Sequence, residues 1–315
     1  MNNFLSDVLK GLQSSPKYLD SKYFYDKKGD ELFQKIMDSD EYYLTNAEME
    51  IFCEQKSQIA DTVSDHNNQI DVIEFGPGDA TKSIHLLKEL SARKQISNYM
   101  PIDISENIIN LLNTSLPTKI PDLTIHGFAG EYFQMLPLAH QVSSNKKLVL
   151  FLGANIGNFK FDEMPAFLQN LRTLLSTADM VLIGFDLKKN PNKILAAYDD
   201  KAGYTREFNL NLLRRINSEL KGNFEIENFQ HYAMYDPSTG ACKSYLISMK
   251  EQSVMIDNTT IHFEKNEPVF MEISQKYSLK EIHTIAHQCG FEVMKYFFDN
   301  NIYFVDVIVR CNGME

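Results

Sequence analysis

One acidic, glycine-containing loop could bind a nucleoside. The segment Glu74-Phe75-Gly76-Pro77-Gly78 follows a short β-rich run at 70–75 and precedes a helical pattern at 80–93. Glycines at such a strand-to-helix turn let the backbone turn tightly and approach a ligand. Asp103 ends the next β-rich run, and a carboxylate there, or Glu74 itself, can accept hydrogen bonds from ribose hydroxyls. The spacing predicts a nucleotide-type cofactor, and a structural turn without a ligand is the alternative.

The loop departs from a dinucleotide fingerprint. That motif needs glycine or alanine at its third position, where this chain has Thr81. Acidic residues beside the loop suit a sulfonium nucleoside better than an anionic dinucleotide. We therefore expect S-adenosylmethionine (SAM) as the cofactor.

A polar loop follows the fourth predicted strand. The apolar run at 148–152 is typical of a central parallel strand, and Gly153-Ala154-Asn155-Ile156-Gly157-Asn158 comes after it. Asn158 offers both a donor and an acceptor to a polar substrate, although turn chemistry alone would also explain it. The loop lacks the Asn/Asp-Pro-Pro-aromatic pattern of enzymes that methylate nucleic-acid bases. We therefore expect a small-molecule substrate and no nucleic acid.

Other reaction chemistries have weak support. His283 and His287 have helical spacing but lack the glutamate of the HExxH zinc motif, so we expect both to face solvent. We expect Asp199 and Asp200 to be a surface pair or indirect support for a site. No other His or Cys cluster has zinc spacing, so no metal site is predicted. No GxSxG segment or Walker A loop occurs.

Charge and composition narrow the class further. The 315 residues include 31 Lys+Arg and 42 Asp+Glu, a net charge of −11, which argues against a general nucleic-acid or membrane-surface binder. No apolar stretch reaches the roughly 20 residues that span a bilayer, and the first residues do not resemble a secretory signal. The four cysteines lie far apart, as expected for reduced thiols in a cytoplasmic protein.

Strand and helix patterns alternate through the middle of the chain. The expected strands lie near 70–75, 98–103, 123–125, 148–152 and 180–185, and the expected helices near 46–65, 80–93, after Ser105, and 161–175. This order predicts a doubly wound parallel sheet. Residues 191–220 look helical, residues 224–276 look like antiparallel strands, a helix at 278–288 ends at Gly290, and two strands follow near 291–298 and 302–310.

The fold class expected from this order is α/β. A five-stranded Rossmann-like sheet with a terminal antiparallel hairpin is similar to the class I methyltransferase architecture, and an inserted α+β lobe interrupts it. We expect a SAM-binding domain at 48–187 and 277–315. We expect a substrate-binding lobe at 1–47 and 188–276.

Segments spread over nearly the whole chain carry a family resemblance. They are Pro16-Lys17 through Asp26, Gly29 through Phe33, Glu41 through Glu48, Glu74 through Gly78, Pro101-Ile102-Asp103, Phe151 through Gly153, Ile156-Gly157-Asn158, Tyr198-Asp199-Asp200 with Ala202-Gly203, and Glu272-Ile273-Ser274 with Lys276. Together they make the chain similar to the histidine Nα-methyltransferases of ergothioneine biosynthesis and the wider histidine-specific methyltransferase family. The resemblance implies a monomeric, SAM-dependent enzyme that methylates the α-amino group of an amino acid up to three times, giving a betaine.

The resemblance also implies roles for single residues. On the cofactor side it places Gly76 and Gly78 against SAM, Asp103 at the ribose, and Glu74, Lys82, Glu131 and Tyr132 in the rest of the cofactor site. On the substrate side it places Tyr25 and Phe33 near the reaction centre, Tyr42 by the amine, Asn158 and Tyr198 at the α-carboxylate, and Glu272 and Ser274 at the imidazole.

The chain departs from the family pattern at three places. Ser244 stands where the family has a methionine beside the imidazole, Gly153-Ala154-Asn155 replaces Gly-Ser-Thr, and Glu131-Tyr132 replaces Asp-Phe. The first two could reshape the side-chain pocket. Another amino acid or an indole derivative therefore remains open as substrate, as does a SAM-binding protein without catalysis.

Overall fold

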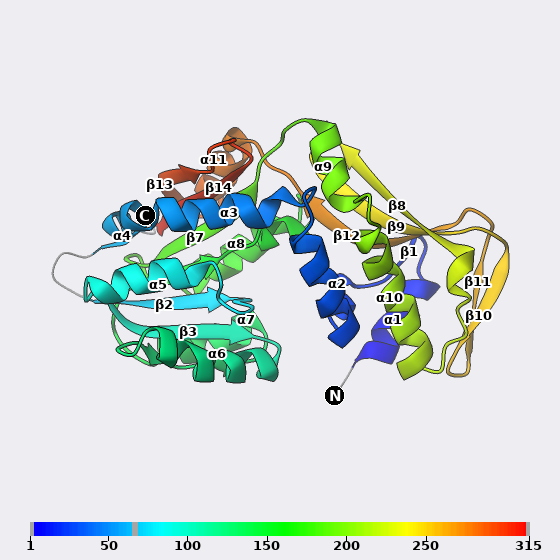
Figure 1. Ribbon diagram of the computed structural model, residues 1–315, viewed down its shortest axis with the longest axis horizontal. Helices are drawn as coiled ribbons and strands as arrows, with labels where there is room; N and C mark the ends of the chain where they lie inside the picture. Colours follow the sequence, from blue (N-terminus) through cyan, green and yellow to red (C-terminus); the bar gives the residue numbers. More distant parts are fainter. Residues whose placement is uncertain (1–2, 65–68, 313–315) are drawn as a thin grey trace. The chain divides into compact units, whose positions relative to one another are not determined.

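The computed structural model describes residues 3–64 and 69–312, and these form two compact units (Figure 1). The first unit contains the described residues up to Tyr43 together with Lys189–Gln275. The second contains Leu44–Lys188 and the described residues from Lys276 onward. These boundaries lie within four residues of those expected from the sequence.

The second unit is built on one eight-stranded sheet. Its strands are β2 (Ile70–Phe75), β3 (Ile96–Asp103), β4 (Thr124–Ile125), β5 (Phe128–Ala129), β6 (Lys147–Phe151), β7 (Met180–Asp186), β13 (Phe291–Phe298) and β14 (Phe304–Cys311). Their order is β13-β14-β7-β6-β2-β3-β4, with β5 also paired to β3. Strand β14 runs antiparallel to both of its neighbours, β7 and β13, and the other pairings in this sheet are parallel. The predicted Rossmann-like sheet with a terminal hairpin is therefore confirmed.

Helices cover this sheet. They are α3 (Tyr43–Glu54), α4 (Lys56–Val63), α5 (Ser83–Ala92), α6 (Glu106–Lys119), α7 (Tyr132–His140), α8 (Met164–Thr173) and α11 (Leu279–Gln288). Ser105 caps α6, as its position predicted, and Ser278 forms a capping box with Glu281 on α11. The prediction of a single helix at 46–65 was wrong, because the helix is interrupted at Gln55, which separates α3 from α4.

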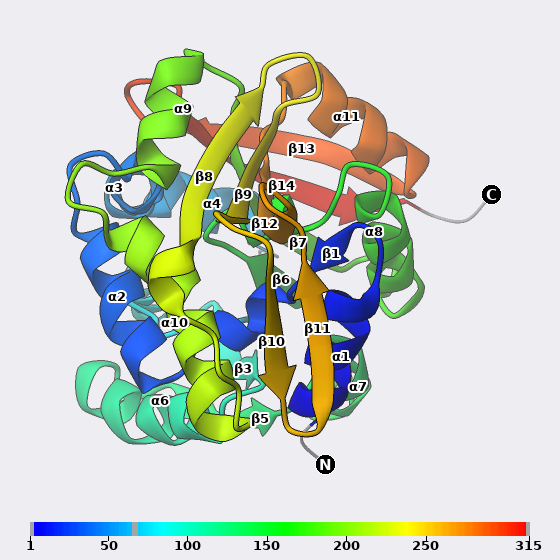
Figure 2. The ribbon, with the colours of Figure 1, turned by 90° about the vertical axis from the view of Figure 1, so that its right-hand side faces the viewer.

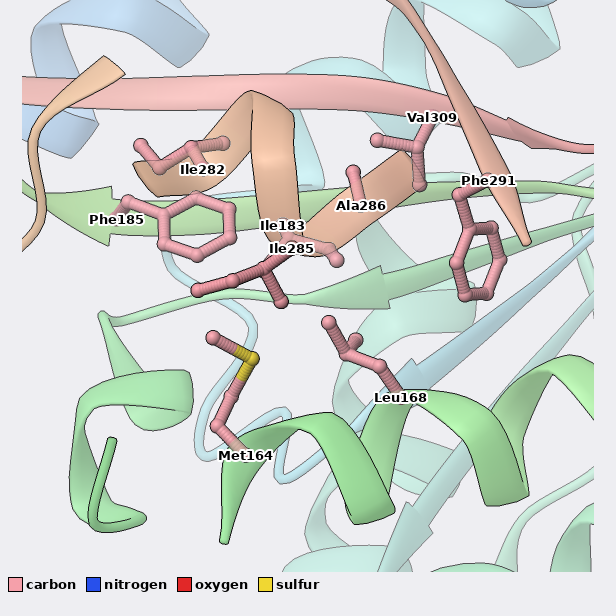
Figure 3. A pocket seen from close by; sticks show the side chains of 9 residues that line it. All are labelled: Met164, Leu168, Ile183, Phe185, Ile282, Ile285, Ala286, Phe291 and Val309. Atoms are coloured by element: carbon pink, nitrogen blue, oxygen red, sulfur yellow. The ribbon is translucent and has the colours of Figure 1, made fainter. Parts of the chain in front are cut away.

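Helices α8 and α11 pack against an apolar face of the sheet. A cavity of about 10 Å³ is left there, and Figure 3 shows its apolar lining from both helices, β7 and the terminal hairpin. The lining residues are Met164, Leu168, Ile183, Phe185, Ile282, Ile285, Ala286, Phe291 and Val309. A void of this size, with no polar atoms to hold a water, is a packing gap in the core and not a ligand site.

The first unit combines a small mixed sheet with helices. Its sheet has the order β1-β12-β9-β8, and a separate hairpin joins β10 to β11. The strands are β1 (Lys17–Tyr18), β8 (Phe229–Asp236), β9 (Ala241–Ser248), β10 (Gln252–Ile256), β11 (Thr259–Phe263) and β12 (Pro268–Gln275). The helical segments are α1 (Phe4–Gln13), η1 (Ser21–Phe24), α2 (Lys27–Met37), α9 (Pro191–Tyr198), α10 (Tyr204–Glu219) and η3 (Ile226–Asn228).

Helix α10 joins the parts of the first unit, because it packs against both α2 and β8 (Figure 2). The helical region expected at 191–220 is two helices. Gly203 adopts a positive φ of +74°, and the carboxylate of Asp200 accepts hydrogen bonds from the backbone N–H groups of Tyr204 and Thr205. These contacts end one helix and start the next.

No helix in the described part of the chain is long and apolar enough to cross a membrane.

Candidate active site

The glycine loop lies where β2 ends, at the carboxyl edge of the parallel strands. Gly76 and Gly78 have φ values of +60° and +55°, a conformation that favours glycine. A Cβ atom on Gly76 would lie 2.8 Å from the hydroxyl oxygen of Tyr132, whereas one on Gly78 would meet nothing within 4 Å. Gly76 is therefore required both by its backbone conformation and by its neighbour.

Tyr132 opens α7 and forms one side of this loop. Its ring stacks on Phe75, with ring centroids 4.7 Å apart and an interplanar angle of 7°. Burial raises the pKa of Tyr132, and the negative charge of nearby Asp103 raises it further. Asp103 accepts a hydrogen bond from the backbone N–H of Ser105 at 2.8 Å, and Glu131 is exposed. The structure thus brings Gly76, Tyr132 and Asp103 together.

Glu74, which the sequence analysis assigned to the cofactor site, is buried. Its side chain lies in the interior beneath the loop, and it accepts a hydrogen bond from the hydroxyl of Tyr99 at 2.6 Å. Burial raises the pKa of Glu74 to about 7. Its contact with a cofactor remains a prediction.

Glu74→Gln should become more stable relative to the unmodified protein as the pH rises. Between pH 4.5 and 7 the folded state holds a proton on Glu74 that the unfolded state has lost, so this group's contribution to stability falls as the pH rises. The glutamine can still accept from Tyr99 but does not titrate. Urea unfolding should show the variant gaining on the order of 3 kcal/mol between pH 4.5 and 8. If the difference in unfolding free energy between the variant and the unmodified protein were the same at both pH values, Glu74 would be ionised in the folded state.

Lys82 immediately precedes α5 and forms an ion pair with Glu48 of α3. Glu48 is fully buried, and it also accepts the backbone N–H of Gly153 at 2.7 and 3.0 Å. The sequence analysis assigned Glu48 no role. Its presence in a segment that resembles the family was the only signal for it.

The loop after β6 carries Asn158. Gly153 and Ala154 both have positive φ values, and the short helix η2 (Asn155–Asn158) follows them. The side chain of Asn158 is exposed, which leaves its amide accessible.

Aromatic side chains form a connected group in the first unit. Phe33 lies 5.6 Å from Tyr25 and 6.3 Å from Tyr42, and Tyr42 lies 6.3 Å from Tyr198, measured between ring centroids. Phe208 packs against Tyr25 and Phe33 at 5.6 and 5.8 Å, and the sequence analysis missed it. The structure therefore brings together Tyr25, Phe33, Tyr42 and Tyr198, as a site for an amine would need.

A polar group adjoins these rings. The hydroxyl of Tyr198 donates to the hydroxyl of Ser274 at 2.7 Å, and the amide of Asn209 donates to Glu272 at 3.4 Å. Glu272 is directly opposite Ser244 in the pairing of β12 with β9, so both point to the same face of the sheet. Ser244 is buried, and no described residue forms a hydrogen bond with its hydroxyl.

The two histidines considered for zinc chemistry face solvent as expected, whereas Asp200 is buried and does not form a surface pair with Asp199. His283 and His287 are exposed, Asp199 is exposed, and Asp200 caps α10. Within residues 3–64 and 69–312, no group of three or more His, Cys, Asp or Glu side chains could hold a metal ion. All four cysteines are free thiols.

The site residues fall into two sets. Glu74, Gly76, Gly78, Lys82, Asp103, Glu131, Tyr132 and Asn158 belong to the second unit. Tyr25, Phe33, Tyr42, Tyr198, Ser244, Glu272 and Ser274 belong to the first unit. Each set is arranged by its own unit's core.

Comparisons with known proteins found a matching family and several similar sequences. A family model described as "Histidine-specific methyltransferase, SAM-dependent" matches residues 4–311. A histidine N-alpha-methyltransferase of Mycobacterium tuberculosis is 29% identical over 93% of this chain and 90% of its own length. The protein of that name from Mycolicibacterium smegmatis is 28% identical over 90% and 87%. A 4-dimethylallyltryptophan N-methyltransferase of Aspergillus fumigatus is 25% identical over 90% and 87%.

Proposed function

We propose that this chain, which belongs to the family of histidine-specific, SAM-dependent methyltransferases, methylates the α-amino nitrogen of L-histidine. We expect up to three transfers, which end in the trimethylated betaine.

The placement of Glu272 near Ser274 on β12 is the observation that favours histidine as the substrate. They lie two positions apart on β12, so their side chains share one face of the sheet. A neutral imidazole has one N–H donor and one nitrogen acceptor, which a carboxylate and a hydroxyl can satisfy together. Asn209 and Tyr198 hold the two side chains in place through the hydrogen bonds described above.

The second unit fits an adenosine-containing cofactor. Gly78 leaves the backbone open to a close approach, Asp103 offers a carboxylate for ribose hydroxyls, and Tyr132 adds an aromatic wall. When bound, SAM supplies an electrophilic methyl group on a sulfonium. We propose that the amide of Asn158 donates to the substrate's α-carboxylate, while the single hydroxyl proton of Tyr198 is donated to Ser274.

The chain's own contribution to the reaction is positioning. In-line methyl transfer requires a neutral amine held at near-attack distance, with no covalent intermediate on the protein. The third methyl transfer would leave the nitrogen as a quaternary ammonium, whose positive charge cannot be lost by deprotonation. The faces of Tyr25, Phe33 and Tyr42 can stabilise such a cation by roughly 0.5–2 kcal/mol each, and a tyrosine hydroxyl can relay the proton that leaves.

A mass-spectrometric screen tests the proposal. Purified protein and SAM are incubated separately with each standard amino acid and with tryptophan derivatives. We expect histidine alone to gain mass in steps of one methylene. Gain on a different amino acid would keep the reaction and overturn the substrate. No gain on any compound, with cofactor binding confirmed by calorimetry, would favour a binding protein.

A tryptophan-type substrate is the second candidate. Ser244 is smaller than the methionine that the family has at this position, so it leaves more room beside Glu272 for an indole. One relative is named for methylating 4-dimethylallyltryptophan. The incubations with tryptophan and its derivatives in the screen distinguish this substrate from histidine.

We also propose that the enzyme acts as a monomer in the cytoplasm and does not bind nucleic acid. The four free thiols support a reducing compartment. Sedimentation of the purified protein tests the monomer.

A further inference from the structure

Three carboxyl groups and one ammonium group lie together inside the second unit. Glu48 and Asp306 are each 0% exposed and Glu74 is 3% exposed, and Lys82 is the cation among them. The charges of Glu48 and Lys82 both act on Glu74 and on Asp306. One cation cannot balance three buried carboxylates, so at least one of the acids must hold a proton.

Glu74 is one such acid below about pH 7, and the strand register identifies Asp306, beside Glu48, as a second one. Asp306 of β14 is directly opposite Gly184 of β7, and a Cβ atom on Gly184 would overlap the Oε1 atom of Glu48. The carboxyl group of Glu48 therefore fills the space beside Asp306 that a side chain at position 184 would occupy. Among the described residues, none donates a hydrogen bond to either carboxyl oxygen of Asp306. Burial, and then the charge of Glu48, raises the pKa of Asp306 well above its ordinary value.

Glu48 connects two elements of the candidate site. Its carboxylate accepts the backbone N–H of Gly153, where the loop that carries Asn158 begins, and it pairs with Lys82 before α5. A shift of Glu48 would therefore move a predicted cofactor residue and a predicted substrate loop together.

We propose that Glu48 and Asp306 share one proton as a carboxyl–carboxylate pair, and that this pair positions Lys82 and the Gly153–Asn158 loop for SAM binding and methyl transfer. Asp306 is the donor and Glu48 is the charged acceptor. Both are positioning residues, because they act through Lys82 and the Gly153 amide. The inference rests on SAM-dependent methyl transfer but not on the choice of histidine.

The first test measures thermal unfolding of the unmodified protein and Asp306→Asn from pH 5 to pH 8. The asparagine amide can donate to Glu48 but does not titrate. In the unmodified protein, the folded state keeps a proton that the unfolded state loses above about pH 4, so stability falls as the pH rises. The charged groups that face Asp306 are Glu48 of α3 and Lys82 before α5, while its strand neighbours Gly184 and Phe297 carry no charge.

We expect the unfolding temperature of Asp306→Asn, relative to the unmodified protein, to rise by roughly 5 °C between pH 5 and pH 8. A difference that stays constant or falls with pH would show that Asp306 is ionised and would overturn the shared proton.

The second test measures S-adenosylhomocysteine binding by calorimetry in Glu48→Gln, Glu48→Asp and Asp71→Asn. Glutamine removes the charge that holds Lys82, and we expect at least tenfold weaker binding. Aspartate keeps the charge and should recover part of the loss. Asp71→Asn is the matched control, since Asp71 also forms a buried ion pair with a lysine, Lys147, in the same sheet.

Weaker S-adenosylhomocysteine binding in Glu48→Gln, with unchanged binding in Asp71→Asn, would support the positioning role of Glu48. Equal losses of binding in the two variants would overturn it. If Glu48→Gln does not fold, Glu48→Asp against Asp71→Asn gives the same comparison with a smaller expected loss. Neither test uses an amino-acid substrate, so failure of histidine in the screen cannot be confused with failure here.

Discussion

Glu272→Ala is expected to lower kcat/KM for histidine by about 10²–10³-fold while S-adenosylhomocysteine binding stays unchanged. Removing the carboxylate leaves the imidazole N–H without its acceptor, and truncating one partner of a buried, charge-assisted hydrogen bond costs roughly 2–5 kcal/mol. The contact of Gly76 with Tyr132 that shapes the glycine loop lies within the second unit, and Glu272 belongs to the first. Steady-state kinetics with histidine and calorimetry with the cofactor product measure the two effects.

Glu272→Gln is the matched control. It keeps an acceptor oxygen of similar size and loses the charge, so we expect an intermediate loss of about tenfold. Unchanged histidine kinetics in Glu272→Ala would remove the assigned role. A matching loss of cofactor binding would instead point to damaged folding.

The sheet of the second unit was predictable because its signals are local. Strands β2, β6 and β7 are short, largely apolar runs, and the turn residues that end them lie next to them in the sequence. Ser105 and Ser278 marked helix starts for the same reason. By contrast, helix α7 was missed because it contains Pro137, which interrupts the expected pattern.

The candidate site was less predictable because its contacts are long-range. Glu48 meets Gly153 across 105 positions of sequence, and no periodic pattern encodes such a contact. The placement of Glu272 opposite Ser244 depends on a register shift between Phe270 and Glu272. Without that bulge, the side chains after it would point to the other face. The resemblance supplied residue types for the site, while packing and register supplied their neighbours.

Gly76→Ala is expected to destabilise the second unit more than Gly78→Ala does. Both glycines have nearly the same positive φ, so alanine brings similar backbone strain, roughly 1–2 kcal/mol, at either position. Only at Gly76 does the new Cβ meet a close neighbour, 2.8 Å away at the hydroxyl oxygen of Tyr132. Relieving that overlap should add about 1–3 kcal/mol. Urea unfolding of the two variants measures the difference.

Tyr132→Phe isolates the steric part of this effect. It removes the hydroxyl oxygen, and the nearest remaining ring atom, Cζ, would lie 3.9 Å from the Cβ of an alanine at position 76, which is ordinary contact. The double variant Gly76→Ala/Tyr132→Phe should therefore recover about 1–3 kcal/mol relative to the sum of the single changes. Gly78→Ala combined with Tyr132→Phe should be additive, because the Cβ at Gly78 touches nothing. Additivity in both pairs would mean that the tyrosine moves away freely and that backbone strain alone requires glycine at position 76.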